Sequence, residues 1–189
     1  MFRQIALSVA MTAGLAWPAI AQDAPSHDKN LDVQSPMGDL HVGKDADAQK
    51  AGLPLYPGAR PRQDPNNDPV NLGVFTEAFG LKLVVAKYES DDSPDKVLAF
   101  YREKMKKYGK VLECHNAGDN TSVHSDDEDD ASKPLTCEGD NHGPVRELKV
   151  GTEGNAHIVA IEDPEHSRNA KATSFVIVYL HRHGRSGEI

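Results

Sequence analysis

Two histidines near the C-terminal end, His181 and His183, are spaced so that they could bind one metal ion together. In a β-strand, side chains two positions apart point to the same face, and the imidazole nitrogen is a common zinc ligand. A third ligand could come from His115, His157 or an acidic residue. Two arginines close to the pair disfavour a bound cation. The alternative is a pair of surface histidines at the end of a strand.

A run of five acidic residues is the most unusual local feature of the chain. Its carboxylates could hold Ca²⁺ weakly, but the run lacks the alternating spacing of a calcium-binding loop, and consecutive carboxylates cannot all converge on one ion. The alternative is a solvated, self-repelling loop tip. We therefore expect no cofactor beyond a weakly bound divalent cation. The run comprises Asp126, Asp127, Glu128, Asp129 and Asp130.

The sequence contains none of the common catalytic motifs. There is no G-x-S-x-G, no P-loop, no H-E-x-x-H and no G-x-G-x-x-G. A hydrolase with dispersed catalytic residues stays open, because such residues meet only in the fold. We expect that the protein is not an enzyme.

The chain has two cysteines, Cys114 and Cys137. An even number of cysteines in an exported protein favours a disulfide, which would stabilise the fold by roughly 3 kcal/mol for a loop of this length. A thiolate metal site or a reactive pair is the alternative, but the spacing is not C-x-x-C. We expect a structural disulfide.

Residues 1–21 have the pattern of a secretory signal peptide. Arg3 supplies the positive charge, an apolar run follows, and Ala19-Ile20-Ala21 matches the A-x-A cleavage site. The run is too short for a transmembrane anchor, and we expect no membrane span elsewhere. The sequence therefore predicts a periplasmic or secreted protein.

Composition and charge limit the classes of partner. The 189 residues carry 21 Lys and Arg against 29 Asp and Glu, a formal net charge of -8. An acidic protein repels phosphate backbones, so we expect no binding to nucleic acid. Hydrophobic residues make up 38% of the chain and aromatic residues 6%, which is enough for one modest core.

The element pattern predicts a single α+β domain over residues 53–183, an antiparallel sheet of about five to six strands with one main helix packed on one face. Residues 22–52 have few large apolar side chains, so we expect a flexible spacer there. An acidic loop is expected at 116–134 and a tail at 184–189. The expected strands are 70–79, 81–89, 110–115, 145–150, 157–162 and 174–182.

The main helix is expected to begin at Ser93-Pro94-Asp95, which offers an N-cap, a proline at the first helical position and an acidic residue in the first turn. Gly109 is expected to end it. Five apolar residues recur at helical spacing and form one stripe to face the sheet. They are Val97, Leu98, Tyr101, Met105 and Tyr108.

Two segments resemble a group of uncharacterised bacterial exported proteins, of which the acidobacterial members are the most similar. One is Leu55-Tyr56-Pro57-Gly58-Ala59, which contains the group's YPGA motif. The other is Ser90-Asp91-Asp92-Ser93-Pro94-Asp95-Lys96-Val97 running into Ala99-Phe100-Tyr101, which resembles the group's helix of the form spekVlaFYrekLkkyG. The resemblance implies a fold and carries no functional residue.

The sequence as a whole favours an exported, non-enzymatic binding or envelope-interaction module, whose partner is an unidentified protein or envelope component. A periplasmic protein that binds a divalent metal through the histidines and the acidic loop is the alternative.

Overall fold

The computed structural model describes residues 30–62, 69–77, 79–116, 131–137, 139–162 and 171–184. The strands of this part form one antiparallel sheet in the order β1-β2-β4-β5-β9-β8-β7-β6, with the short β3 paired to β5. The strands are β1 (Leu31–Ser35), β2 (Gly38–Gly43), β3 (Arg60–Pro61), β4 (Val70–Phe75), β5 (Gly80–Ser90), β6 (Leu112–Asn116), β7 (Val145–Thr152), β8 (Asn155–Ile161) and β9 (Thr173–His183). One α-helix, α1 (Pro94–Met105), continues into a 3-10 turn, η1 (Lys106–Tyr108).

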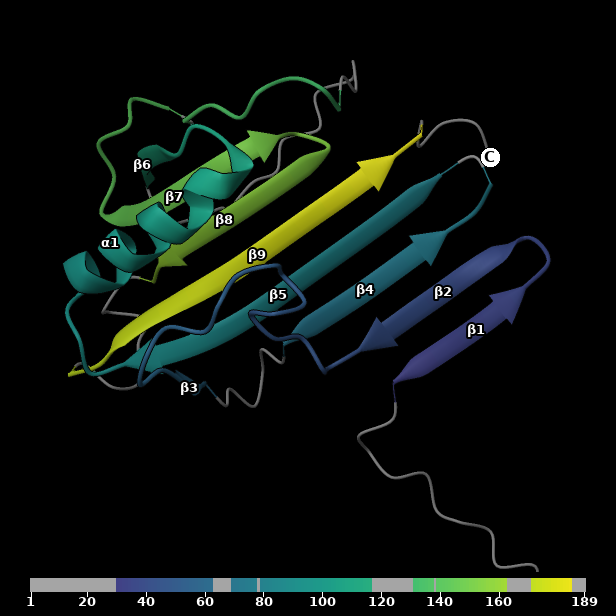
Figure 1. The fold of residues 1–189 in the computed structure, drawn as a ribbon, viewed down its shortest axis with the longest axis horizontal. Coiled ribbons are helices and arrows are strands. Elements are labelled where there is room, and N and C mark those ends of the chain that lie inside the picture. The colour runs from purple at the N-terminus through teal and green to yellow at the C-terminus, as the bar shows by residue number, and fades with distance from the viewer. Residues whose placement is uncertain are drawn as a thin grey trace, which may run out of the picture.

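The helix covers one half of one face of the sheet. It follows β5 at the centre of the sheet and leads to β6 at the far edge, and it lies over β8 and β7 (Figure 1). Residues 44–59 lie over the same face beside the helix (Figure 1). We call this the helix face. Strands β1, β2 and β4 lie on the other side of β5, where the helix does not cover the sheet.

The main core lies between the helix and the sheet. The predicted apolar stripe is buried at four of its five positions, Val97, Leu98, Tyr101 and Met105. The fifth, Tyr108, lies in η1 and is partly buried against the same core. The sheet residues that meet them are Val84, Ala86 and Tyr88 of β5, Leu148 and Val150 of β7, Val159 and Ile161 of β8, and Phe175 and Ile177 of β9. A second, smaller cluster lies on the other face of the sheet, which we call the reverse face, and contains Ile158, Ala160, Val176 and Val178, with Leu83 and Val85 packed against it.

Aromatic hydroxyls hold residues 44–59 onto this core. The hydroxyl of Tyr88 accepts a hydrogen bond from the backbone N–H of Ala48 at 2.9 Å, and that of Tyr101 accepts one from the N–H of Tyr56 at 3.1 Å. Both hydroxyls are buried and need such partners, because an unpaired buried polar group is costly. The segment is therefore part of the fold.

The helix ends largely follow the sequence. Pro94 is the first helical residue, and the backbone carbonyl of Ser93 accepts hydrogen bonds from Lys96 and Val97, but the Ser93 side chain makes no capping hydrogen bond. Gly109 closes η1 with a φ of 138°, a conformation that L side chains rarely adopt.

The predicted fold class is wrong. Instead of a five-to-six-stranded α+β sheet with a main helix, the described residues form a mostly antiparallel β structure of nine strands with one short helix. Each of the six expected strands has a counterpart, with shifted ends. The additional strands are β1, β2 and β3.

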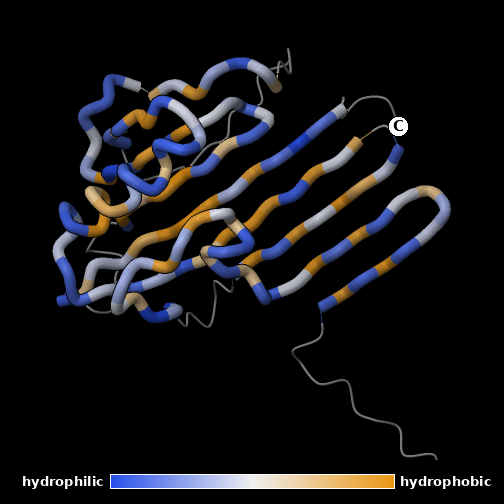
Figure 2. Tube along the Cα trace, viewed as in Figure 1, coloured by the Kyte–Doolittle hydropathy of each residue, from blue (hydrophilic) through white to orange (hydrophobic). Residues whose placement is uncertain are grey.

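The spacer predicted at 22–52 is wrong from Leu31 onward. β1 and β2 occupy residues 31–35 and 38–43, and Ala48 and Ala51 are buried in the main core. The sequence does not reveal these strands because they lie at the edge of the sheet. An edge strand with a solvated face needs few large apolar residues, so its alternation resembles a polar linker (Figure 2).

Several predicted segments lie wholly or partly outside the described residues. They are the signal peptide at 1–21, the acidic run at 126–130 with most of the loop at 116–134, and residues 185–189 of the tail.

Candidate functional site

The predicted histidine pair lies at the end of β9. His181 and His183 share the helix face, and their ring centroids are 6.3 Å apart. In the ladder with β5 they stand opposite Lys82 and Gly80. Within the described residues, no group of three or more His, Cys, Asp or Glu side chains is arranged to hold a metal ion. The structure thus places the two histidines side by side but supplies no third ligand there, and metal binding stays a prediction.

His157, one of the suggested third ligands, is a core residue. Its ring lies between Tyr108 and Tyr179, with centroid distances of 3.8 Å and 4.6 Å. Burial, together with the positive charge of Lys107, lowers the pKa of His157 to about 4. The imidazole is therefore neutral at physiological pH, and it serves packing.

The predicted disulfide is confirmed. Cys114, in the middle of β6, is bonded to Cys137, with Cα atoms 5.3 Å apart. Beyond the disulfide, the chain runs along the outer side of β6. The side-chain oxygen of Asn141 accepts a hydrogen bond from the N–H of His115 at 2.6 Å, and the His115 carbonyl accepts one from the N–H of Gly143 at 3.3 Å. This edge of the sheet is covered.

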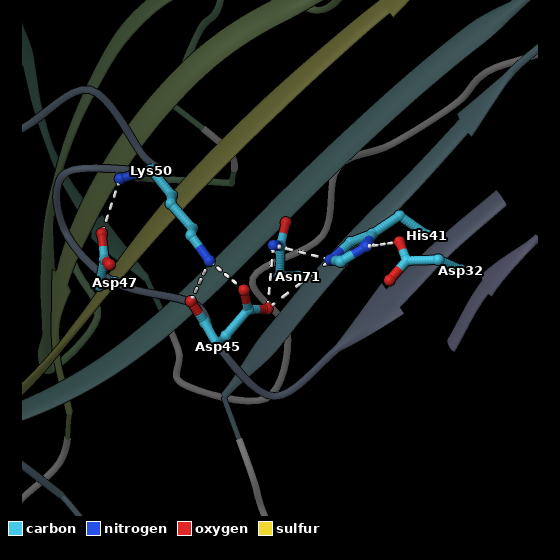
Figure 3. A network of polar contacts seen from close by, with 6 residues as sticks. All are labelled: Asp32, His41, Asp45, Asp47, Lys50 and Asn71. Atoms are coloured by element: carbon cyan, nitrogen blue, oxygen red, sulfur yellow. Dashed lines mark hydrogen bonds and ion pairs between the residues drawn. The ribbon is translucent and has the colours of Figure 1, made fainter. Parts of the chain in front are cut away.

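A polar network that the sequence analysis missed lies on the helix face where β1, β2 and β4 meet (Figure 3). Nδ1 of His41 lies 2.6 Å from a carboxylate oxygen of Asp32. On the other side of the ring, Nε2 lies 3.0 Å from the amide nitrogen of Asn71. The same amide donates to Asp45 at 3.1 Å, and Lys50 forms an ion pair with Asp45.

The hydrogen-bond partners determine the protonation of this network. Because a carboxylate only accepts, Nδ1 of His41 carries the proton, and Nε2 accepts from the Asn71 amide. The Lys50 ammonium first, and the Asn71 amide second, lower the pKa of Asp45 to about 2. The carboxylate of Asp32 lies beside Nδ1 of His41, and that of Asp45 lies on the Nε2 side of the ring. The two carboxylates and the imidazole therefore cannot bind one metal ion together. The network therefore ties β1 and β2 to β4 and to residues 44–50.

The reverse face carries exposed apolar side chains at the end of the sheet remote from the helix. Leu72 stands opposite Leu83, which packs with the reverse-face cluster, and Val42 stands opposite Leu72. Residues an even number of positions from these on the same strands, and their ladder partners on β1, therefore lie on the reverse face. Seven of them form what we call the apolar surface: Leu31 and Val33 of β1, Leu40 and Val42 of β2, and Val70, Leu72 and Val74 of β4.

Four residues of the apolar surface are exposed and three are half-buried. Leu31 is 54% exposed, Val33 45%, Val42 40% and Val70 38%, whereas Ile158 in the middle of the same face is 3% exposed. The half-buried residues are Leu40, Leu72 and Val74. The only α-helix of the described residues lies on the other face. Scattered exposed apolar residues are normal, but a contiguous set on one face is typical of an interaction surface.

The signal for this surface was present in the sequence. Leu31, Val33, Leu40 and Val42 alternate with polar residues at the period of a half-buried strand. Each run is short, and neither contains an aromatic residue. The polar composition of residues 22–52 therefore predicted a spacer although these runs alternate like strands.

Comparison with protein-family models, with curated proteins and with solved structures finds no match for this chain. The resemblance to exported bacterial proteins therefore stays a prediction. No helix in the described part of the chain is long and apolar enough to cross a membrane. The disulfide is compatible with an oxidising compartment.

Proposed function

We propose that the protein is an exported, non-enzymatic binding module that holds a protein or envelope component against its apolar surface. The observation that carries this proposal is the contiguous exposure of apolar side chains on β1, β2 and β4, at the end of the sheet that the helix does not reach.

The physical basis is the cost of leaving this surface in water. Burying apolar area stabilises a complex by about 25 cal/mol per Å² before the costs of association. The strands behind the surface are held in register by the sheet and by the network around His41, so little ordering is needed when a partner binds. An apolar surface held in place in this way favours a partner with a complementary apolar strip.

The metal-binding alternative has weaker support. It would rest on His181, His183 and the acidic run at 126–130, which lies outside the described residues. Within the described residues, no third ligand lies beside the two histidines. The apolar surface needs no additional group to bind a partner.

Two variants of β4 test the proposal, because Val70 and Phe75 are each 38% exposed but lie on opposite faces of the same strand. A photoreactive benzoylphenylalanine is placed at one or the other position, and the chain is irradiated in the periplasm of the exporting cell. We expect a specific covalent adduct from position 70 and none from position 75.

A dye measures the surface independently. Anilinonaphthalene sulfonate should bind the folded chain, and Val70→Lys should reduce its fluorescence several-fold more than Phe75→Lys, since both changes add one positive charge. Adducts from both positions or from neither, or equal loss of dye binding in the two variants, would contradict the proposal.

A further inference from the structure

The two edges of the sheet differ. The outer side of β6 is covered by the chain that follows the disulfide, through Asn141 and Gly143. Within the described part of the chain, no segment covers the outer side of β1 in this way: β1 is the last strand of the sheet, its five residues are all exposed, and its only ladder partner is β2. β1 also contains no proline, glycine or lysine, the residues that commonly protect an edge strand.

The turn between β1 and β2 determines which backbone groups of β1 point outward. It has two residues, so the pair that closes it, Ser35 and Gly38, must exchange both backbone hydrogen bonds. Inward-bonded and outward-pointing residues alternate along an antiparallel strand. The N–H and C=O groups of Asp32 and Gln34 therefore point away from the sheet and are available to another strand.

From this geometry we propose that two copies of this chain pair antiparallel through β1, with a two-fold axis at Val33. In this register Asp32 of each copy stands opposite Gln34 of the other, and the outward groups of both residues make four backbone hydrogen bonds. The proposal concerns the edge of β1 and does not depend on what the apolar surface binds.

The side chains select this register over its neighbours. An axis at Asp32 would place two carboxylates directly opposite each other, and like charges opposite each other destabilise a ladder. An axis at Gln34 would place Pro36, which has no N–H, at a hydrogen-bonding position opposite Asp32. Of these three axes, the one at Val33 avoids both faults.

The Val33 register is also complementary on both faces. On the helix face, the Gln34 amide can donate to the carboxylate of Asp32 of the second copy, whose side chain is 65% exposed. On the reverse face, the two Val33 side chains meet. The pairing is isologous, as a two-fold axis requires, and it joins the two apolar surfaces into one.

The register can be tested by charge at position 34. Gln34→Lys places an ammonium opposite each Asp32 and should tighten the dimer. Gln34→Glu places a second carboxylate opposite each Asp32 and should weaken it. Each change acts at two symmetric positions, so we expect about a tenfold shift of the dimer dissociation constant in each direction. Sedimentation equilibrium of the chain from Gln22 onward, up to millimolar concentration, measures it.

Gln49→Lys and Gln49→Glu control for net charge, because Gln49 is exposed and lies outside β1. These variants should dimerise like the parent chain. Circular dichroism should show that all four variants keep the fold.

A parent chain that stays monomeric at every concentration overturns the proposal. So does an equal response to the changes at positions 34 and 49. Neither result bears on photo-crosslinking at position 70, so the dimer and the proposed binding function fail separately.

Discussion

Asp32 accepts a hydrogen bond from Nδ1 of His41 at 2.6 Å, across the first ladder of the sheet. The contact joins the outermost strand to its neighbour through side chains on the helix face, while apolar residues occupy the reverse face. Asn71 continues the connection to β4 and to Asp45. The hairpin of β1 and β2 is thus held by polar contacts on the helix face, while its apolar side chains on the reverse face, such as Leu31 and Val33, stay exposed.

Asn71→Ala should loosen this hairpin. The change leaves Nε2 of His41 and a carboxylate oxygen of Asp45 without their donor, which costs about 1–3 kcal/mol for partly buried groups. It should also raise the pKa of Asp45 from about 2 toward its ordinary value, because the Asn71 amide is the second largest cause of the shift. Amide hydrogen exchange in β1 and β2, and NMR titration of the Asp45 carboxyl, measure both effects.

Asn155→Ala, at the exposed start of β8, is the matched control and should change neither quantity. Faster exchange spread evenly over the whole sheet would show that the network does not act locally on the hairpin.

His157 should make the stability of the fold depend on pH. Its pKa is lowered from 6.5 to about 4 in the folded chain, so between these values the unfolded chain binds more protons. Stability should fall as the pH is lowered from 6.5 to 4 and should not change further through this residue below pH 4. The full loss amounts to about 3 kcal/mol at most.

His157→Phe keeps a ring between Tyr108 and Tyr179 and cannot titrate. Urea denaturation at a series of pH values should show a shallower decline for this variant, and the difference between the two curves isolates His157 from the other histidines. Parallel curves for the parent chain and the variant would disprove the effect.

Glu147 and Lys149 form an ion pair on the reverse face of β7, with Nζ and Oε1 2.7 Å apart and side chains that are 0% and 4% exposed. Removing one partner leaves a buried charge, so Glu147→Leu and Lys149→Met should each destabilise the fold by about 3–5 kcal/mol. The double variant removes both charges and should be close to the parent in stability. Urea denaturation of the parent, the two single variants and the double variant gives a double-mutant cycle for this ion pair. If the double variant loses the sum of the two single losses, Glu147 and Lys149 are not energetically coupled.

Much of the covered half of the fold was predictable. The helix at Pro94–Met105 combines a proline at its start with an apolar stripe at helical spacing, and these signals are local. β5 is apolar on both faces, as expected of an internal strand, and it lies between β4 and β9. The disulfide followed from the number of cysteines and the signs of export.

The exposed half was not predictable in the same way. Strand pairing brings together residues that are far apart in the sequence, such as His41 and Asn71. No local sequence pattern predicts which residues will meet in this way. A half-exposed edge strand such as β1 lacks the apolar run by which buried strands are recognised.

The sequence by itself determined where the helix and the central strands form and that the two cysteines pair, because these depend on local spacing and composition. Only the tertiary structure decided that residues 31–43 join the sheet, that Asp32, His41, Asn71 and Asp45 meet, and that one apolar face stays open. Those features depend on which strand lies beside which, and the packing of the whole sheet sets that order.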